Sequence, residues 1–293
     1  MKFNFLYIIS AFILFFSSCS KPIANFIIKD AEKIAPAKVT FQNNSQKADR
    51  YEWDFGDGKK STDSLAYHEY KKSGNYSIIL KAYKGNKVSV TKQQLVVNAP
   101  LECTVEIETE FGTMLAVLHS STPLHRDNFT KLAEEGYYDD LIFHRVISEF
   151  MIQGGDPSSR NASANQMLGS GGPDYKIPAE FVDTLVHTKG ALAAARSNNP
   201  KKESSGSQFY IVQGKKWTAD QLNYLENQKG IHYTPEERRL YMEVGGTPHL
   251  DKEYTVFGQV VKGLDVIDKI AAVQKNGNDR PLKDVKMKIR VIK

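Results

Sequence analysis

Between Pro22 and Asn98, short segments in which apolar and polar residues alternate are separated by turn signals about every dozen residues. Repeated short strands of this kind are typical of a small β-sandwich, and nothing in the segment calls for a helix. The turns Gly56-Asp57-Gly58 and Gly85-Asn86 offer the positive φ values that tight hairpins demand. The strands predicted for this segment are 37–41, 51–55, 76–83 and 87–97.

Length, composition and charge indicate a globular chain with more than one domain. Its 293 residues suffice for about two domains, and 41% hydrophobic with 25% charged residues excludes wholesale disorder. The net charge of +5 is too small to indicate a nucleic-acid partner, and we expect none. Residues 21–98 carry +6 and residues 99–293 carry −2, which places a boundary near residue 99. The basic part is interpreted as a solvated surface, with contact to an acidic envelope polymer or glycan as the alternative.

The N-terminus has the layout of an export signal. Lys2 precedes an apolar stretch over 3–16, which is shorter than the ~20 residues that span a bilayer. The small residues Ser17 and Ser18 before Cys19 resemble the bacterial lipoprotein signal. This resemblance implies a signal peptide over 1–18, a lipid on Cys19, a linker over 19–22 and a place in a bacterial cell envelope, facing the periplasm or the exterior.

The other cysteine, Cys103, is interpreted as a small apolar residue at a strand edge. With Cys19 lipidated, Cys103 has no partner for a disulfide within the mature chain. Neither cysteine belongs to a metal-like cluster.

A second resemblance covers residues 23–98. The residues that carry it are Trp53-Asp54-Phe55-Gly56-Asp57-Gly58, His68-Glu69-Tyr70 and Gly74-Asn75-Tyr76. They are similar to a PKD domain, which implies spacing or binding and no chemistry. Trp53 and Phe55 alternate with Asp54, so we expect both rings to point into the core. Asp54 and Asp57 are interpreted as turn caps rather than calcium ligands, because the alternating oxygen ligands of a calcium loop are absent.

From residue 101 onward the pattern changes. Strands are predicted at 103–107 and 114–118, across a turn at Phe111-Gly112. Thr122 and Pro123 provide a cap and a first helical position for a helix that ends near Gly136, and a second helix is predicted over 264–273. The remainder is mostly strand and loop. We therefore expect a closed barrel covered by two helices.

One run fixes nine positions within fourteen residues: Phe143-His144-Arg145, Phe150-Met151 and Gln153-Gly154-Gly155-Asp156. Further matches follow in order: Gly190-Ala191-Leu192, Gly206-Ser207-Gln208-Phe209-Tyr210, Leu250-Asp251 and Tyr254 to Gly258. From about residue 104 to the C-terminus, the chain resembles the cyclophilin family of peptidyl-prolyl cis-trans isomerases. The resemblance implies a mainly β fold, with an eight-stranded antiparallel barrel over 101–293 after the immunoglobulin-like sandwich over 23–98.

The resemblance also implies a site that needs no cofactor and no metal. Rotation about an X-Pro bond is opposed by amide resonance, with a barrier of ~18–20 kcal/mol. The twisted transition state regains a lone pair on the prolyl nitrogen, which Arg145 is expected to hydrogen-bond, with Gln153 as the second catalytic residue. The substrate-binding residues that it implies are Phe150, Met151, Ala195, Arg196, Gln208, Tyr210, His249, Leu250 and Tyr254.

Three of these residues depart from the best-known pattern of the family. Arg196 stands where many members have Asn, His249 takes the place of a Trp that helps bind cyclosporin, and Tyr254 replaces a His. We expect catalysis to be kept and drug sensitivity to be altered. His144 is expected to be packed and hydrogen-bonded, Asp156 to fix the following loop, and residues 169–172 to form a flexible loop near the groove.

An insertion separates two groups of pocket residues, between Gln213 and Thr247. Capping boxes at 218–221 and 234–237, and the glycines at 245–246, predict two short helices. The insertion is either a surface decoration or a rim that selects substrates or partners.

The sequence thus predicts a peptidyl-prolyl cis-trans isomerase that assists folding of exported, proline-containing polypeptides while a lipid tethers it to the membrane. The alternative is a surface peptide-binding or adhesion protein in which the barrel is a non-catalytic scaffold.

Overall fold

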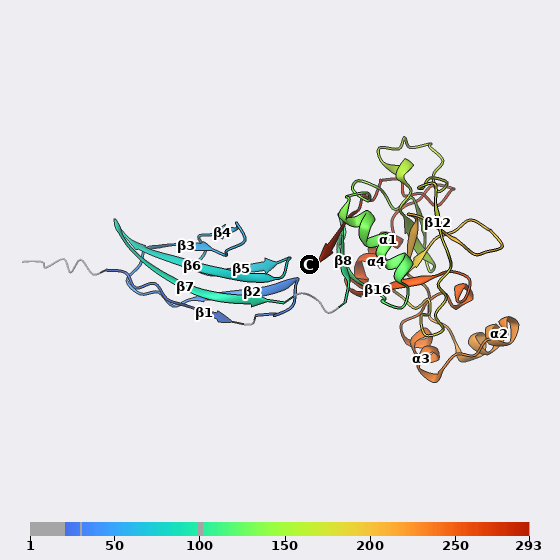
Figure 1. Cartoon of the computed structure of the whole chain (residues 1–293), viewed down its shortest axis with the longest axis horizontal. Coiled ribbons are helices and arrows are strands. Elements are labelled where there is room, and N and C mark those ends of the chain that lie inside the picture. Colours follow the sequence, from blue (N-terminus) through green and yellow to red (C-terminus); the bar gives the residue numbers. More distant parts are fainter. Residues whose placement is uncertain (1–20, 30, 99–101, 293) are drawn as a thin grey trace, which may run out of the picture. The chain divides into compact units, whose positions relative to one another are not determined.

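A computed structural model describes residues 21–29, 31–98 and 102–292. The predicted signal peptide over 1–18 and Cys19 lie outside the described residues. The chain divides between Asn98 and Ala99 into two compact units, each of which is described by itself (Figure 1). No helix in the described ranges is both apolar enough and long enough to cross a membrane.

Two antiparallel sheets form the first unit. One has the strand order β1-β2-β5 and the other β4-β3-β6-β7. The four predicted strands correspond to β2, β3, β6 and β7, whereas β1, β4 and β5 were not predicted. The strands are β1 (Phe26–Lys29), β2 (Ala37–Asn43), β3 (Arg50–Asp54), β4 (Lys60–Ser61), β5 (Leu65–Tyr70), β6 (Gly74–Lys84) and β7 (Lys87–Val97).

Aromatic side chains fill the space within this sandwich. Trp53 and Phe55 are buried, as predicted, and the Trp53 ring lies 5.1 Å from Phe26 and 5.8 Å from Phe41 between centroids. The indole N–H of Trp53 donates to the Asp63 carbonyl at 2.9 Å, which satisfies its polar atom. The sandwich is therefore held by a ring cluster contributed by both sheets.

The interpretation of the two aspartates as turn caps is confirmed. The Gly56 N–H donates to Asp54 Oδ1 at 3.0 Å, and the Lys59 N–H donates to Asp57 Oδ1 at 3.0 Å. Asp57 also bonds His68 Nε2 at 2.7 Å. These contacts fix the hairpin turn after β3.

An eight-stranded antiparallel sheet forms the second unit, in the order β10-β11-β15-β13-β16-β9-β8-β17. A bridge between Ile142 and Lys286 joins the segments that precede the two edge strands, so the sheet curls back on itself. The predicted mainly β fold with an eight-stranded barrel is confirmed. The strands are β8 (Thr104–Thr109), β9 (Gly112–Leu118), β10 (Arg145–Ile147), β11 (Met151–Gly154), β13 (Ala191–Ala194), β15 (Phe209–Val212), β16 (Val256–Lys262) and β17 (Lys288–Ile292), with a small sheet of β12 (Lys176–Ile177) and β14 (Ser204–Ser205) beside them.

Two helices cover the barrel, as predicted: α1 (Pro123–Glu134) and α4 (Leu264–Ala271). The apolar sides of both helices belong to the same buried cluster as the inward residues of the strands. Pro123 holds the first turn of α1, but the expected side-chain cap is wrong. The Thr122 hydroxyl instead donates to the His119 carbonyl at 3.3 Å, which stabilises the turn before the helix.

The insertion forms the two predicted helices, α2 (Ala219–Lys229) and α3 (Pro235–Glu243), which lie next to each other (Figure 1). Both capping boxes are present, with Thr218 and Thr234 as the caps. Its two ends meet, because the Gly246 N–H donates to the Lys215 carbonyl at 3.0 Å. The insertion therefore leaves the barrel and returns to it at nearly one point.

Candidate active site

Three neighbouring strands place the polar and aromatic site residues in one row. Arg145 on β10 lies opposite Gln153 on β11, which lies opposite Tyr210 on β15. Residues directly opposite each other in a sheet share a face, so these three side chains lie on the same side. Their neighbours along the strands, such as Ile152 and Ile211, point to the other face and belong to the barrel interior. The row therefore lies on the outer face of the barrel.

An apolar floor lies beside this row. It is a cluster separate from the barrel core, and six of the predicted substrate-binding residues belong to it. Met151, Ala195 and Tyr210 are buried, and the other three are partly buried. The structure thus brings together residues from four separate stretches of the chain. These six residues are Phe150, Met151, Ala195, Tyr210, Leu250 and Tyr254.

A 3₁₀ turn at Pro248–Leu250 supplies one wall of this pocket. The ring of His249 stacks on Phe150 at 5.7 Å between centroids, and Tyr254 meets Tyr210 edge-on at 5.9 Å. Loss of hydration on burial lowers the pKa of His249 below its ordinary value, which favours the neutral ring. His249 therefore forms an aromatic wall of the pocket.

Arg145 is the charged member of this row. Its side chain is exposed, and no described residue forms a hydrogen bond or ion pair with its guanidinium. It lines a depression of about 480 Å³ together with Gln153 and the segment 164–169. A guanidinium with all its donors available is suited to bind a ligand that covers it.

Gln153 and Gln208 form a connected pair. Gln153 Nε2 donates to Gln208 Oε1 at 3.1 Å, and Gln208 Nε2 donates to the carbonyls of Gly169 at 3.0 Å and Gly171 at 2.6 Å. The amide of Gln208 thus holds the loop over 169–172. Among the described residues, no hydrogen bond uses the side-chain carbonyl oxygen of Gln153, so this acceptor stays available to a ligand.

Asp156 fixes the same loop, as predicted. Its Oδ2 accepts from the Gly169 N–H at 2.5 Å and from the Gly171 N–H at 3.3 Å. Burial opposes its charge, but these bonds and those from Ser158 hold the pKa of Asp156 below its usual value. The expectation of a flexible loop over 169–172 therefore needs correction, because Asp156 and Gln208 anchor it from both sides.

Arg196 lies over the pocket wall. Its guanidinium sits 4.6 Å from the centre of the Tyr254 ring and donates through Nε to the Glu253 carbonyl at 3.0 Å. Among the described residues, no group bonds the main-chain N–H or carbonyl of Arg196. Ala195 uses both of its main-chain groups, with Gln208 and Ser205. A substrate backbone would therefore meet free main-chain groups at Arg196 rather than at Ala195.

The expected hydrogen bonds of His144 are absent. Its ring is buried, but neither ring nitrogen has a partner among the described residues. Burial, partly offset by Asp156, lowers the pKa of His144 to about 4. The ring lies against the backbone of the loop over 169–172, since a Cβ atom on Gly169 would be only 3.5 Å from His144 Nε2.

Sequence reasoning missed two residues at the site. Trp217, from the insertion, lies 6.5 Å from the His249 ring, and its indole N–H donates to the Gly246 carbonyl at 3.0 Å. His187 is fully buried and bonds the hydroxyl of Tyr210 at 3.0 Å. Neither lies within a local motif, so only the three-dimensional fold reveals their place.

A family model described as cyclophilin type peptidyl-prolyl cis-trans isomerase/CLD matches residues 104–291. The chain belongs to this family. The expectation of a cyclophilin-type peptidyl-prolyl isomerase is thereby confirmed. A PKD domain model matches residues 19–99, which confirms the second resemblance.

Individual proteins agree with this assignment. A putative bifunctional phosphatase/peptidyl-prolyl cis-trans isomerase of Streptococcus pyogenes is 42% identical over 186 residues, which are 62% of this chain and 37% of that protein. A putative peptidyl-prolyl cis-trans isomerase of Staphylococcus aureus is 36% identical over 185 residues, which are 63% of this chain and 88% of that protein. The chain thus spans little more than a third of the first relative's length. A solved cyclophilin type isomerase of Cryptosporidium parvum shares the fold, with a TM-score of 0.50 and 24% identity over 66% of this chain and 98% of that one.

This geometry can act on a proline amide without proton transfer. The apolar floor offers a surface on which an apolar proline ring can pack, while Arg145 lies at the polar end of the row. Arginine keeps its charge throughout the accessible pH range. It can therefore donate to a prolyl nitrogen that gains a lone pair only when the amide twists.

Proposed function

We propose that this cyclophilin isomerises X-Pro bonds of exported polypeptides while tethered to a bacterial membrane through a lipid on Cys19. The isomerase activity rests on one observation: the unpaired Arg145 shares a face with Gln153 and Tyr210, next to a separate apolar floor. Transition-state stabilisation by a donor requires that donor to be free for the substrate. No described residue competes for the guanidinium.

Support for export and tethering comes from the sequence. Lys2, the apolar stretch over 3–16 and the small residues before Cys19 follow the layout of a lipoprotein signal. A mature chain anchored by acyl groups would work at the envelope, where newly exported chains fold. The PKD-like unit would then act as a spacer, and its charge of +6 over 21–98 favours contact with acidic envelope polymers or glycans.

A proline-peptide assay tests the activity. The purified chain is mixed with a peptide that contains one X-Pro bond, and the cis-to-trans rate is measured against the uncatalysed rate. We expect turnover that scales with enzyme concentration and is lost on saturation with a competing proline peptide. Binding of the peptide without turnover would contradict the isomerase proposal.

That outcome would favour the alternative, a peptide-binding or adhesion protein built on a non-catalytic barrel. The free guanidinium of Arg145 favours the isomerase, because a twisting amide offers it a prolyl nitrogen lone pair that a bound planar peptide does not. A refolding assay with a proline-limited protein then tests the role in folding. Fractionation of cells tests the location.

A further inference from the structure

The hydroxyl group of Tyr210 points away from Arg145 and Gln153, toward a buried histidine. Its side chain is 4% exposed, and the hydroxyl lies 3.0 Å from Nε2 of His187. The two rings are nearly parallel, at 12°. Burial raises the pKa of Tyr210 well above its usual value, so the hydroxyl keeps its proton and can donate it.

His187 continues the contact inward. Its main-chain N–H donates to Oδ1 of Asp251 at 2.8 Å, and its Nδ1 lies 2.7 Å from the same oxygen. An ionised carboxylate only accepts hydrogen bonds, so Nδ1 carries the proton. In the neutral ring, Nε2 is then the acceptor for Tyr210. Asp251 therefore selects the tautomer that can hold the Tyr210 hydroxyl.

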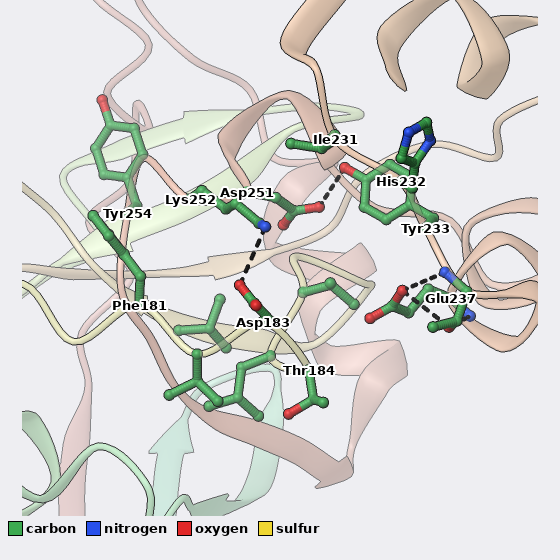
Figure 2. Close-up of a pocket in the computed structure, with 15 residues that line it drawn as sticks. Phe181, Asp183, Thr184, Ile231, His232, Tyr233, Glu237, Asp251, Lys252 and Tyr254 are labelled. Atoms are coloured by element: carbon green, nitrogen blue, oxygen red, sulfur yellow. Dashed lines mark hydrogen bonds and ion pairs between the residues drawn. The ribbon is translucent and has the colours of Figure 1, made fainter. Parts of the chain in front are cut away.

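Asp251 is the centre of the arrangement. It is 3% exposed, and its Oδ2 accepts from the hydroxyls of Tyr241 at 2.6 Å and Tyr233 at 2.7 Å. Figure 2 shows the Tyr233 hydroxyl directed at this carboxylate. Burial opposes the charge, but the bonds from His187 and from both tyrosines lower the pKa of Asp251. The carboxylate is thus ionised, and donors occupy both of its oxygens.

The two tyrosines belong to the insertion. Tyr241 lies on α3, and Tyr233 lies in the loop before it. In addition, Lys229 at the end of α2 donates from Nζ to the carbonyls of Asp251 at 2.6 Å and His249 at 3.0 Å. The insertion therefore holds the same segment that carries the pocket wall, through side-chain and main-chain contacts.

Within the insertion, the helices are fixed to each other. Arg238 on α3 pairs with Glu226 on α2 and donates to Asn223 Oδ1 at 2.7 Å. Glu226 in turn accepts from the Tyr233 N–H at 2.7 Å. The tyrosine hydroxyls are therefore presented to Asp251 by a rigid unit rather than by a loose loop.

We propose that His187 and Asp251 are positioning residues of the isomerase, and that the hydrogen-bond chain from Tyr233 and Tyr241 through them to Tyr210 makes the insertion part of the proline pocket. This inference rests on the proposed function for its catalytic consequence. Hydrogen bonds within a buried chain strengthen one another, and a buried carboxylate that loses donors is left unsatisfied at a cost in free energy. Removing the donors of the insertion would thus change how His187 holds the Tyr210 ring.

The test removes hydroxyls only. The full chain carrying both Tyr233→Phe and Tyr241→Phe is compared with Tyr224→Phe, a control on α2 whose side chain is 70% exposed. Since the pocket wall contacts the proline in ground and transition states alike, we expect KM for a proline peptide to rise at least about threefold with kcat within about twofold. The control should leave both constants unchanged. If the double variant does not fold, Tyr233→Phe alone gives the same comparison.

A double-mutant cycle separates coupling from a general loss of structure. Tyr210→Phe keeps the pocket ring but breaks the last hydrogen bond of the chain. In that background, the two insertion substitutions should lower kcat/KM by less than half the factor seen in the wild type. Equal factors in both backgrounds would overturn the proposal.

An NMR measurement is independent of turnover. The ring resonances of Tyr210 and the ring nitrogens of His187 should shift in the double variant and stay fixed in Tyr224→Phe. If the chain proves inactive but these shifts occur, the proposed function fails and the coupling stands. Unchanged resonances in the double variant would refute the coupling itself.

Discussion

Replacement of Arg145 by alanine removes the proposed transition-state donor and little else. The side chain is exposed and has no described ion-pair or hydrogen-bond partner, so no structural contact is lost. Exposed substitutions of this kind usually change stability by less than about 0.5 kcal/mol. The variant should therefore unfold at the same temperature as the wild type.

The expected kinetic effect follows from the strength of one charged hydrogen bond. Such a bond contributes about 1.5–3 kcal/mol, which corresponds to about 10- to 100-fold in rate. Because Arg145 is open to solvent until substrate covers it, the lower end of this range applies. We expect kcat to fall about 10-fold, with KM changed less, since the interaction forms only in the twisted state.

The assay follows cis-to-trans conversion of a proline peptide, with two comparison variants. Arg145→Lys keeps the charge but loses the planar donor geometry, and should restore only part of the rate. Arg126→Ala removes an arginine on α1 that pairs with Asp127, and should have no effect. Wild-type kcat in a folded Arg145→Ala variant would refute the reasoning, because the apolar pocket alone would then account for turnover.

Three further outcomes are expected. The pKa of His144 is lowered to about 4, against about 6.5 when unfolded, so its contribution to the free energy of unfolding should be complete above about pH 6.5 and be lost as the pH decreases toward 4, by up to about 3 kcal/mol. Denaturant titrations at a series of pH values should show that the free energy of unfolding depends less steeply on pH in His144→Gln than in the wild type. Equal pH dependence in the two proteins would exclude His144 as the cause. Activity should be nearly flat between about pH 6 and 8, because an arginine side chain keeps its charge there and the lowered pKa of His249 moves its titration below the ordinary range; a titration near 6.5 that His249→Phe abolishes would contradict this. Acyl-chain labelling should mark the wild type and not Cys19→Ala, and label that does not depend on Cys19 would rule out the lipoprotein proposal.

Local sequence patterns predicted the parts of this molecule that are locally determined. The capping boxes at Thr218 and Thr234 act within four residues of chain, and both are present. Trp53 and Phe55 point into the core because a strand alternates its faces. The dense run over 143–156 was sufficient to predict the family and the barrel. In each case the relevant partners lie close together in the chain or repeat at a fixed period.

The errors arose where distant partners decide the outcome. The expected cap of α1 is the exception, because the carbonyl that accepts the Thr122 hydroxyl belongs to His119, only three residues away. Residues 169–172 were expected to be flexible. Their anchors, Asp156 and Gln208, could not be recognised from the sequence, because they lie 13 and 39 residues away from Gly169. The unpredicted strands are defined by their partners, since β1 and β5 pair with β2 and the two-residue β4 pairs with β3.

Part of the candidate site was likewise beyond sequence reasoning. The partners of His187 are Tyr210 and Asp251, at sequence separations of 23 and 64 residues. Nothing near His187 in the chain indicates either contact, since a histidine beside a strand is usually a packed residue. The roles of Arg145, Gln153 and the predicted substrate-binding residues stay predictions, although the structure gathers most of them on one face.

The meeting of the insertion's two ends at Lys215 and Gly246 has a consequence for how this protein can vary. The 30 residues between them occupy the place of a tight turn in the barrel, because the chain leaves and returns at two residues that are hydrogen-bonded to each other. Closing a longer or shorter loop at such a junction costs only about 0.6 kcal/mol for each doubling of length. A different element with the same ends could therefore be exchanged there during evolution or by engineering, provided that it supplies donors to the Asp251 carboxylate in place of Tyr233 and Tyr241, and the pocket would acquire a new neighbour.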